Sequence, residues 1–399
     1  MIARLDTGVA KSITLGDIVR AAMPDFSQNH RLPTQHWKVL RAIAACRTPV
    51  LGGHQYECNR CGKGHFMPHS CGNRHCPNCQ NLKGAQWLEK QVEHLLPVPY
   101  FHIVFTLPHE LNPLIQHNQR RLYSLLFSSA TATLLEFGRN NLKATLGITA
   151  VLHTWGQNLS DHYHLHCVVT GGGNSLDGES WVSQSPRWLF PVRALSVVFR
   201  AKFRDGIKKL FEEGQLQMPI ANESLFDPIV FKQWLRRLCR HKWVVYAKRP
   251  FAGPQAVLAY LCRYTHRVAI TNGRLQALDP ENGKVTFSYK DYARDSIIRS
   301  MTLSQKEFLR RFCLHILPSR FVKIRHYGLL SNRNRPARIA KARELIARIP
   351  HPPVQAQEMP LTVQTLEPLP MVCPHCGHSS LILIRVINRP KKPTIWDSS

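Results

Sequence analysis

Residues 153–169 read HTWGQNLSDHYHLHCVV, and this stretch predicts the centre of the fold. Two strand-like runs, ITAVLHTW (148–155) and YHLHCVVT (163–170), flank the polar segment GQNLSD, which predicts a β-hairpin. Alternate side chains of a strand share a face, so His164 and His166 point the same way, with His162 one step further out. Glycines 171–173 are expected to end the second strand.

Two imidazoles on one strand face can hold a divalent ion. A third ligand can come from the neighbouring strand, where His153 lies opposite in any hairpin that closes around GQNLSD. A histidine-rich edge strand that faces solvent would show the same pattern. This stretch by itself therefore leaves a metal site and an edge strand open.

A second motif is Tyr260-Leu-Cys-Arg-Tyr264, within a run that predicts a helix after Pro254. Residues four apart lie on one helical face, so both phenols would project side by side, next to Arg263 and Arg267. Ordinary amphipathic packing would give the same spacing. A strand that can bind a metal ion, a helix that presents two tyrosines and a basic surface together favour phosphodiester cleavage through a covalent phosphotyrosine.

The 399-residue chain carries 53 Lys and Arg against 25 Asp and Glu, a formal net charge of +28. A charge of this size indicates an anionic partner, most commonly nucleic acid. Residues 294–348 alone hold 14 basic against 3 acidic residues. We find no apolar run of membrane-spanning or signal-peptide type, so a cytoplasmic, nucleoid-associated protein without membrane partners is expected.

Cysteines cluster near the N-terminus. Cys58-x-x-Cys61 and Cys76-x-x-Cys79 predict one four-cysteine site for a structural Zn²⁺. Disulfides in a secreted module are the alternative, which the lack of an export signal disfavours. The remaining donors leave several assignments open. Cys71 and His75 are spare ligands that could replace a member of the set or hold a second ion, and the C-terminal pair Cys373 and Cys376 is either half of a zinc site completed elsewhere in the fold or a simple turn.

Composition and periodicity predict four segments. These are an N-terminal helix plus zinc-ribbon-like module (1–97), a catalytic domain (98–300), a basic helical DNA-binding region (301–350), and a Pro-rich linker with a CxxC tail (351–399). Within the second segment we expect a buried strand at 100–107, helices near 193–214 and 227–241, and an Asn272-Gly273 hairpin. Residues 1–35 show few periodic signals.

These motifs, in this order, resemble the two-tyrosine HUH (His-hydrophobic-His) transposases of the insertion-sequence group IS91. The resemblance covers nearly the whole chain and includes SCGNRHCPNCQ (70–80), FTLPHEL (105–111), HTWGQNLSDHYHLHCVV (153–169), AYLCRYTHRVAITNG (259–273) and FLRRFCLHILPSRFVKIRHYGLL (308–330). It implies an α+β fold, in which helices flank a central antiparallel sheet with the metal strand in its middle.

The resemblance also implies the roles of the site residues. His164 and His166 would bind a catalytic Mg²⁺ or Mn²⁺, with His153 as the favoured third ligand and Gln157 and His162 as alternatives. Tyr260 and Tyr264 would be the nucleophiles of rolling-circle transposition through 5′-phosphotyrosine intermediates. We expect the DNA contacts to come from basic residues on the second motif and in the C-terminal region: Arg263, Arg267, Arg310, Arg311, Lys323 and Arg325.

The expected partner is single-stranded DNA at the ends of a mobile element. A host helicase is expected as well, because the sequence has no phosphate-binding loop of the GxxxxGK[ST] type. A replication initiator or relaxase would use the same chemistry in another role. A non-catalytic zinc-ribbon regulator would explain the charge and the cysteines but leave the His and Tyr motifs unused.

Overall fold

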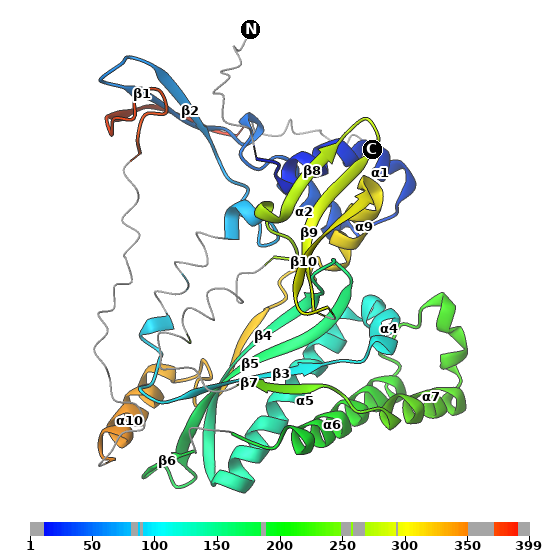
Figure 1. The fold of residues 1–399 in the computed structure, drawn as a ribbon. Coiled ribbons are helices and arrows are strands. Elements are labelled where there is room, and N and C mark those ends of the chain that lie inside the picture. The colour runs from blue at the N-terminus through cyan, green and yellow to red at the C-terminus, as the bar shows by residue number, and fades with distance from the viewer. Residues whose placement is uncertain are drawn as a thin grey trace, which may run out of the picture. The chain divides into compact units, whose positions relative to one another are not determined.

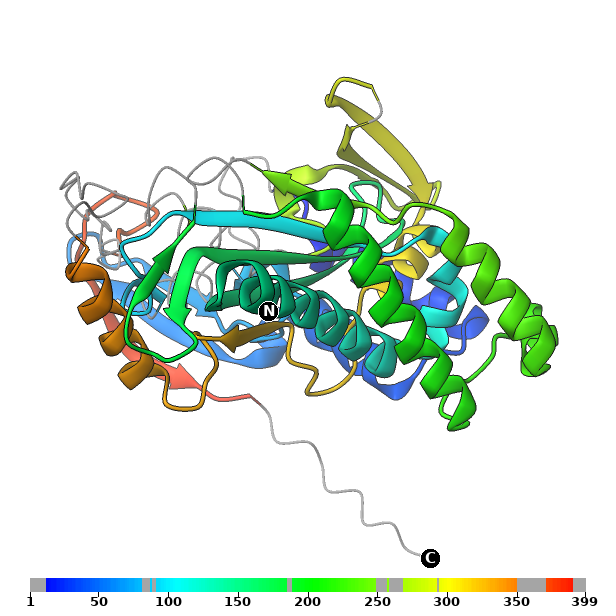
Figure 2. The ribbon, with the colours of Figure 1, turned by 90° about the horizontal axis from the view of Figure 1, so that it is seen from below.

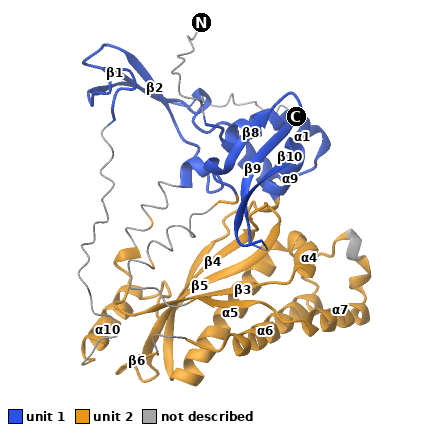
Figure 3. Ribbon diagram, viewed as in Figure 1, with its two compact units in different colours: residues 1–82, 270–313, 358–399 blue, residues 83–269, 314–357 orange. Residues whose placement is uncertain are grey.

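A computed structural model describes most of the chain, in two units (Figure 3). Unit 1 consists of residues 1–82, 270–313 and 358–399, and unit 2 of residues 83–269 and 314–357. The residues described are 12–80, 87, 91–184, 189–248, 257, 268–292, 294–349 and 371–389. Tyr260, Tyr264, Arg263 and Arg267 lie outside these ranges, as does most of the expected helix around them.

Unit 2 is built on an antiparallel sheet in the order β11-β4-β5-β3-β7, with β6 paired to β5 (Figure 1). The long hairpin β4–β5 occupies the middle, so the strand that carries His164 and His166 is flanked on both sides. The strands are β3 (Tyr100–Thr106), β4 (Ala144–Trp155), β5 (Asp161–Ser175), β6 (Trp181–Ser183), β7 (Val245–Lys248) and β11 (Ile324–Gly328).

Helices cover one face of this sheet. Helices α5 (Gln119–Phe137) and α6 (Val192–Glu212) run side by side along it (Figure 2), accompanied by α4 (Asn112–His117) and α7 (Pro228–Arg240). Because strand side chains alternate, the odd-numbered residues of β5, such as Tyr163 and Leu165, are buried in the core under these helices. The even-numbered residues, including the histidines, occupy the opposite face.

A second, smaller apolar cluster lies on the histidine face. It joins Tyr100 of β3 and Val168 of β5 to Leu329, to helix α10 (Arg335–Ala347) and to Val257, which is fully buried. Val257 stands three residues before Tyr260 in the chain. None of the helices within the described ranges is long and apolar enough to cross a membrane.

The described residues of unit 1 include two three-stranded sheets, the helices α1, α2 and α9, and a helical stretch at 77–80. Helix α1 begins with a capping box, in which the Thr14 hydroxyl accepts from the N–H of Asp17 and the Asp17 carboxylate accepts from the N–H of Thr14. The elements are α1 (Leu15–Asn29), α2 (Thr34–Ala44), β1 (Gly53–Cys58), β2 (Gly64–Pro68), β8 (Leu275–Asp279), β9 (Lys284–Asp291), β10 (Ile297–Ser304), α9 (Gln305–Leu314) and β12 (Leu381–Ile387).

The sheets of unit 1 have the orders β12-β1-β2 and β10-β9-β8. Phe287 of β9 packs edge-on against Phe308 of α9, with ring centroids 5.7 Å apart, and both rings are fully buried. Short helical turns lie at 49–51 and 272–274 in unit 1, and at 109–111, 138–142 and 220–226 in unit 2.

The expected α+β class, with antiparallel sheets flanked by helices, is confirmed. Three local expectations differ from the structure. Helix α1 occupies part of the stretch that showed few periodic signals, and the Asn272-Gly273 pair begins a short 3₁₀ turn instead of a hairpin. Strand β5 continues through glycines 171–173 to Ser175.

Strand β5 needs glycine at these three positions because neighbouring backbones approach it too closely for a side chain. A Cβ added to Gly173 would lie 2.2 Å from the carbonyl oxygen of Thr145 on β4, and one on Gly172 would lie 2.4 Å from that of Val182 on β6. The β4–β5 register also shifts between Leu146 and Ile148, beside these glycines. Glycine here allows close approach where a sequence reading expects a break.

We predict that Gly173→Ala destabilises unit 2 by about 1–3 kcal/mol, because the new methyl group must push β4 and β5 apart. The matched control is Gly273→Ala, where an added Cβ meets nothing within 4 Å. Calorimetric unfolding of the two variants and the parent protein measures the effect. Equal melting temperatures for Gly173→Ala and the parent would contradict this account of the glycine-rich stretch.

Candidate functional site

Three histidines meet on the face of the unit 2 sheet opposite helices α5 and α6. His153 of β4 is the register partner of His164 of β5, and His166 lies two residues further on the same face. One ring nitrogen from each histidine lies within 4.8 Å of the others. His153 and His166 are buried, at 3% and 8% exposure, whereas His164 is partly exposed and leaves the cluster open on its side.

The ring orientation of His164 is set by its own strand. Its Nδ1 lies 2.8 Å from the backbone carbonyl oxygen of His162. A carbonyl only accepts hydrogen bonds, so Nδ1 must carry the proton. Nε2 of His164 then keeps its lone pair, which is the tautomer that a metal ligand needs.

His102 of β3 supports His166 in a similar way, although the sequence analysis missed it. Its Nε2 lies 2.8 Å from Nδ1 of His166, and the two rings stack with centroids 5.1 Å apart. Burial, with a smaller contribution from Lys248, lowers the pKa of His102 to about 3, so the ring is neutral. The available signal was a lone histidine within the apolar strand YFHIVFT.

A cation lies next to the cluster. His153 stacks on Trp155 at a centroid distance of 4.9 Å, and the ammonium group of Lys323 is 5.2 Å from the centroid of the Trp155 ring. Of the alternative third ligands, Gln157 lies in the hairpin turn, and His162 lies outside the three-histidine group although its ring is 4.6 Å from that of His164.

The other expected DNA contacts lie elsewhere. Arg310 and Arg311 are on α9 of unit 1, and both bind Glu307 at 2.6 Å. The hydrogen bond from Arg310, followed by that from Arg311, lowers the pKa of Glu307 to about 2. Arg325 lies on the helix-covered side of the unit 2 sheet, with its guanidinium 4.2 Å from the centroid of the Phe127 ring.

A basic pocket of about 440 Å³ lies beside strand β11 in unit 2. Three guanidinium groups, two of which the sequence analysis did not single out, line it together with neutral hydrogen-bonding side chains. This lining is suited to an anion such as a DNA phosphate. The residues are Arg120, Arg320, Arg325, Ser124 and Asn332.

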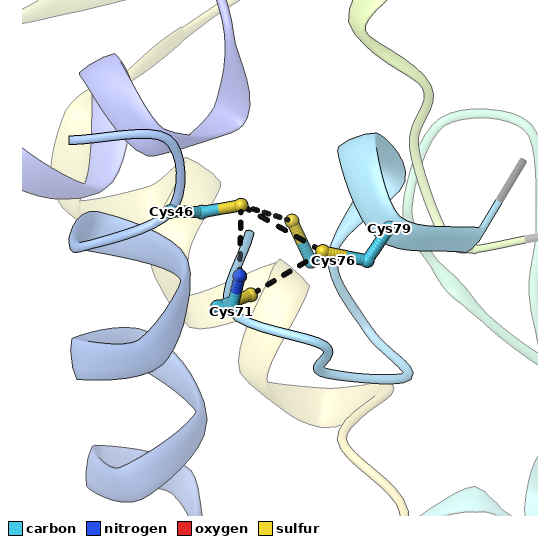
Figure 4. Close-up of side chains that lie close together, drawn as sticks. All are labelled: Cys46, Cys71, Cys76 and Cys79. Carbon is cyan, nitrogen blue, oxygen red and sulfur yellow. Dashed lines mark hydrogen bonds between the residues drawn. The ribbon is translucent and has the colours of Figure 1, made fainter. Parts of the chain in front are cut away.

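In unit 1, four cysteines point toward one another (Figure 4). The sulfur of Cys46 lies 3.6 Å from that of Cys76 and 3.7 Å from that of Cys79, and Cys71 lies 3.6 Å from Cys79. A tetrahedral zinc with Zn–S bonds of 2.3 Å places its sulfurs about 3.8 Å apart. Hydrogen bonds from the thiols of Cys71 and Cys76 hold the pKa of Cys46 well below its ordinary range.

This group corrects the expected set of Cys58, Cys61, Cys76 and Cys79. Cys58 and Cys61 lie instead with Cys373 and Cys376. The reason is the β1–β2 hairpin, which carries the first CxxC pair at its tip, while the chain returns along the five residues of β2 before reaching the second pair. Five strand residues span about 17 Å, too far for one ion.

The proposed nucleophiles, Tyr260 and Tyr264, are not among the described residues. Several other tyrosines are poor candidates for this role. Tyr100, Tyr123 and Tyr163 are buried, and burial raises the pKa of each phenol. A phenol with a raised pKa is a weak nucleophile near neutral pH.

Comparison with known proteins gives matches along most of the chain. Residues 18–107 match the family described as "Transposase zinc-binding domain", and residues 147–337 match the family described as "Putative transposase". The putative transposase y4qJ of Sinorhizobium fredii is 42% identical over 380 residues, 94% of this chain and 95% of that protein.

The transposase for insertion sequence element IS801 of Pseudomonas savastanoi pv. phaseolicola is 29% identical over 345 residues. The match covers 84% of this chain and 80% of the relative. No solved structure matches the chain. The near-complete coverage by relatives and the two family matches show that this chain belongs to the IS91 family of transposases and carries its N-terminal zinc-binding domain.

Proposed function

We propose that this transposase cleaves and rejoins single-stranded DNA at the ends of a mobile element, in a metal-dependent reaction with tyrosine nucleophiles. The observation that carries the proposal is the cluster of His153, His164 and His166 on two paired strands. A divalent ion bound there would neutralise the charge of a phosphodiester under attack. Lys323, near the same cluster, supplies a fixed positive charge for the DNA backbone.

The ring nitrogens of the three histidines favour some metal ions over others. Three neutral imidazole nitrogens suit a transition-metal ion better than Mg²⁺, which prefers oxygen ligands. The hydrogen bond from Nδ1 of His164 to a carbonyl and the contact between His166 and His102 orient two of the rings for this purpose. We therefore expect Mn²⁺ to support cleavage at lower concentration than Mg²⁺.

The position of Val257 supports Tyr260 and Tyr264 as nucleophiles. Val257 packs with Tyr100 and Val168 on the sheet face that carries the histidines. The sequence predicts a helix here, and residues three and seven positions after Val257 share its face of such a helix. Those positions are Tyr260 and Tyr264, so on the helix expected from the sequence both phenols would share the face of Val257.

Cleavage and rejoining by this route need no nucleotide cofactor, because each phosphorus–oxygen bond that breaks is replaced by another. The phenolate oxygen forms a bond to phosphorus while the 3′-oxygen of the preceding nucleotide leaves and takes up a proton. The products are a 5′-phosphotyrosine and a free 3′-hydroxyl. A 3′-hydroxyl can attack the phosphotyrosine in the reverse sense, which rejoins the strand and releases the phenol. Two tyrosines allow two such transfers to proceed in sequence.

For the zinc-binding domain we propose Cys46, Cys71, Cys76 and Cys79 as ligands of a structural Zn²⁺. Their sulfur–sulfur distances of 3.6–3.7 Å fit a tetrahedral ion. All four lie within the matched residues 18–107. His75 lies outside this group of four ligand atoms.

His153→Ala, His164→Ala and His166→Ala should each slow cleavage of a labelled single-stranded oligonucleotide by at least about 100-fold, because the ion supplies several kcal/mol of charge stabilisation. DNA affinity should change less than about twofold, because Lys and Arg contacts to phosphates dominate it. His162→Ala and Gln157→Ala are the matched controls and should cleave normally. Normal cleavage by His153→Ala together with an inactive Gln157→Ala or His162→Ala would show that Gln157 or His162, and not His153, is the third metal ligand.

Tyr260→Phe combined with Tyr264→Phe should abolish the covalent protein–DNA adduct and leave salt-dependent binding of single-stranded DNA intact. Each single variant should stop complete transposition, since each removes one of two transfers. Denaturing gels of labelled DNA, with and without Mn²⁺, detect the adduct. Tyr292→Phe, at an exposed tyrosine, is the control. An adduct that persists in the double variant would place the nucleophile elsewhere.

His102 is proposed as a positioning residue for His166. His102→Leu should raise the Mn²⁺ concentration needed for half-maximal cleavage by about 10–100-fold, with the rate recovered at saturating Mn²⁺. His102→Gln should stay closer to the parent, because its amide oxygen can accept the Nδ1 proton of His166. A Mn²⁺ titration of both variants checks this. Loss of rate at all Mn²⁺ concentrations, without a shift of the midpoint, would indicate a purely structural role.

A further inference from the structure

The second group of cysteines joins segments from the two ends of the chain. Cys58 and Cys61 lie at the β1–β2 turn, and Cys373 and Cys376 lie before β12. The sulfur of Cys58 is 3.7 Å from that of Cys376, and the sulfur of Cys61 is 3.7 Å from that of Cys373. These separations match the edge of a zinc tetrahedron, about 3.8 Å, and greatly exceed the disulfide bond length of about 2.05 Å.

The two loops that present these sulfurs have the same backbone structure. Residues 58–63 read CNRCGK and residues 373–378 read CPHCGH. In both, the N–H of the glycine donates to the carbonyl of the first cysteine at 2.8 Å, and the N–H of that cysteine donates to the carbonyl of the last residue. Both glycines have positive φ, +64° at Gly62 and +70° at Gly377. Two copies of one turn therefore face each other, each with two sulfurs.

The sheet beside these loops has little apolar core. Of the residues in β1, β2 and β12, only Gly53 and Cys58 are buried. Four apolar side chains of β12 are about half exposed: Ile382, Leu383, Ile384 and Val386. A three-stranded sheet without a packed face is marginal in water, and a bound metal is the usual source of the missing stability in so small a module.

We propose that Cys58, Cys61, Cys373 and Cys376 bind a second Zn²⁺, distinct from the one assigned to the Cys46 group. This ion fastens the C-terminal segment 371–389 to the β1–β2 hairpin. The two halves of the site are 312 residues apart in the chain, measured from Cys61 to Cys373. The matched zinc-binding domain ends at residue 107, so half of this site lies beyond it.

Zinc stoichiometry of the full-length protein tests the proposal, in a His164→Ala background so that the histidine cluster holds no ion. Mass spectrometry under native conditions should find two zinc ions per chain. Cys373→Ser/Cys376→Ser should retain one, Cys71→Ser/Cys79→Ser should retain one, and the control Cys239→Ser should retain two. Two zinc ions in the Cys373→Ser/Cys376→Ser variant would overturn the proposal. A parent protein that binds only one zinc ion would overturn it as well.

If the Cys373→Ser/Cys376→Ser variant does not fold, thiol labelling of the protein with all its cysteines intact tests the proposal instead. In the zinc-loaded protein, Cys373 and Cys376 should resist alkylation as strongly as Cys58 and Cys61. Stepwise removal of zinc by a chelator should expose all four together. Alkylation of Cys373 and Cys376 at the rate of unfolded protein, while both zinc ions remain bound, would show that the tail supplies no ligands.

Discussion

The pairing of His153 with His164 across β4 and β5 is the constraint on which the histidine cluster depends. Side chains alternate with a period of two, so a slip of one residue would turn every histidine of β5 into the core beneath α5 and α6. The opposite alternation, with Tyr163 and Leu165 buried in that core, resists such a slip. Pairing of β3 on the far side of β5 fixes the same register again and brings His102 to His166.

The two units obtain their local order from different sources. Unit 2 orients its histidines with a packed core and a continuous sheet. In unit 1, the strands β1, β2 and β12 have few buried side chains, and the group of Cys58, Cys61, Cys373 and Cys376 lies at their end. Groups of free thiols at these separations are open to metal loss and oxidation, whereas a close-packed aromatic core is not.

Alternation along a single strand is a local property, so the sequence was sufficient to predict the hairpin and the shared face of His164 and His166. The cysteine partners were not predictable in this way. Their grouping depends on which end of the β1–β2 hairpin each pair occupies and on a pair more than 300 residues away. Glycines 171–173 were read as a break because a sequence shows backbone freedom but not the neighbouring strands. His102 becomes informative only once β3 is paired with β5.

The pairing of β1 with β12 also has a consequence for synthesis of the protein. Strand β1 leaves the ribosome before its partner β12, which follows more than 300 residues later in the chain. At about 5–20 residues per second, the 312 residues from the one after Cys61 through Cys373 take roughly 15–60 s to make. Throughout that interval one edge of β1 has no partner strand from its own chain. A transposase terminated before β12 would keep that edge exposed, so formation of this sheet reports that the chain has been translated through residue 387.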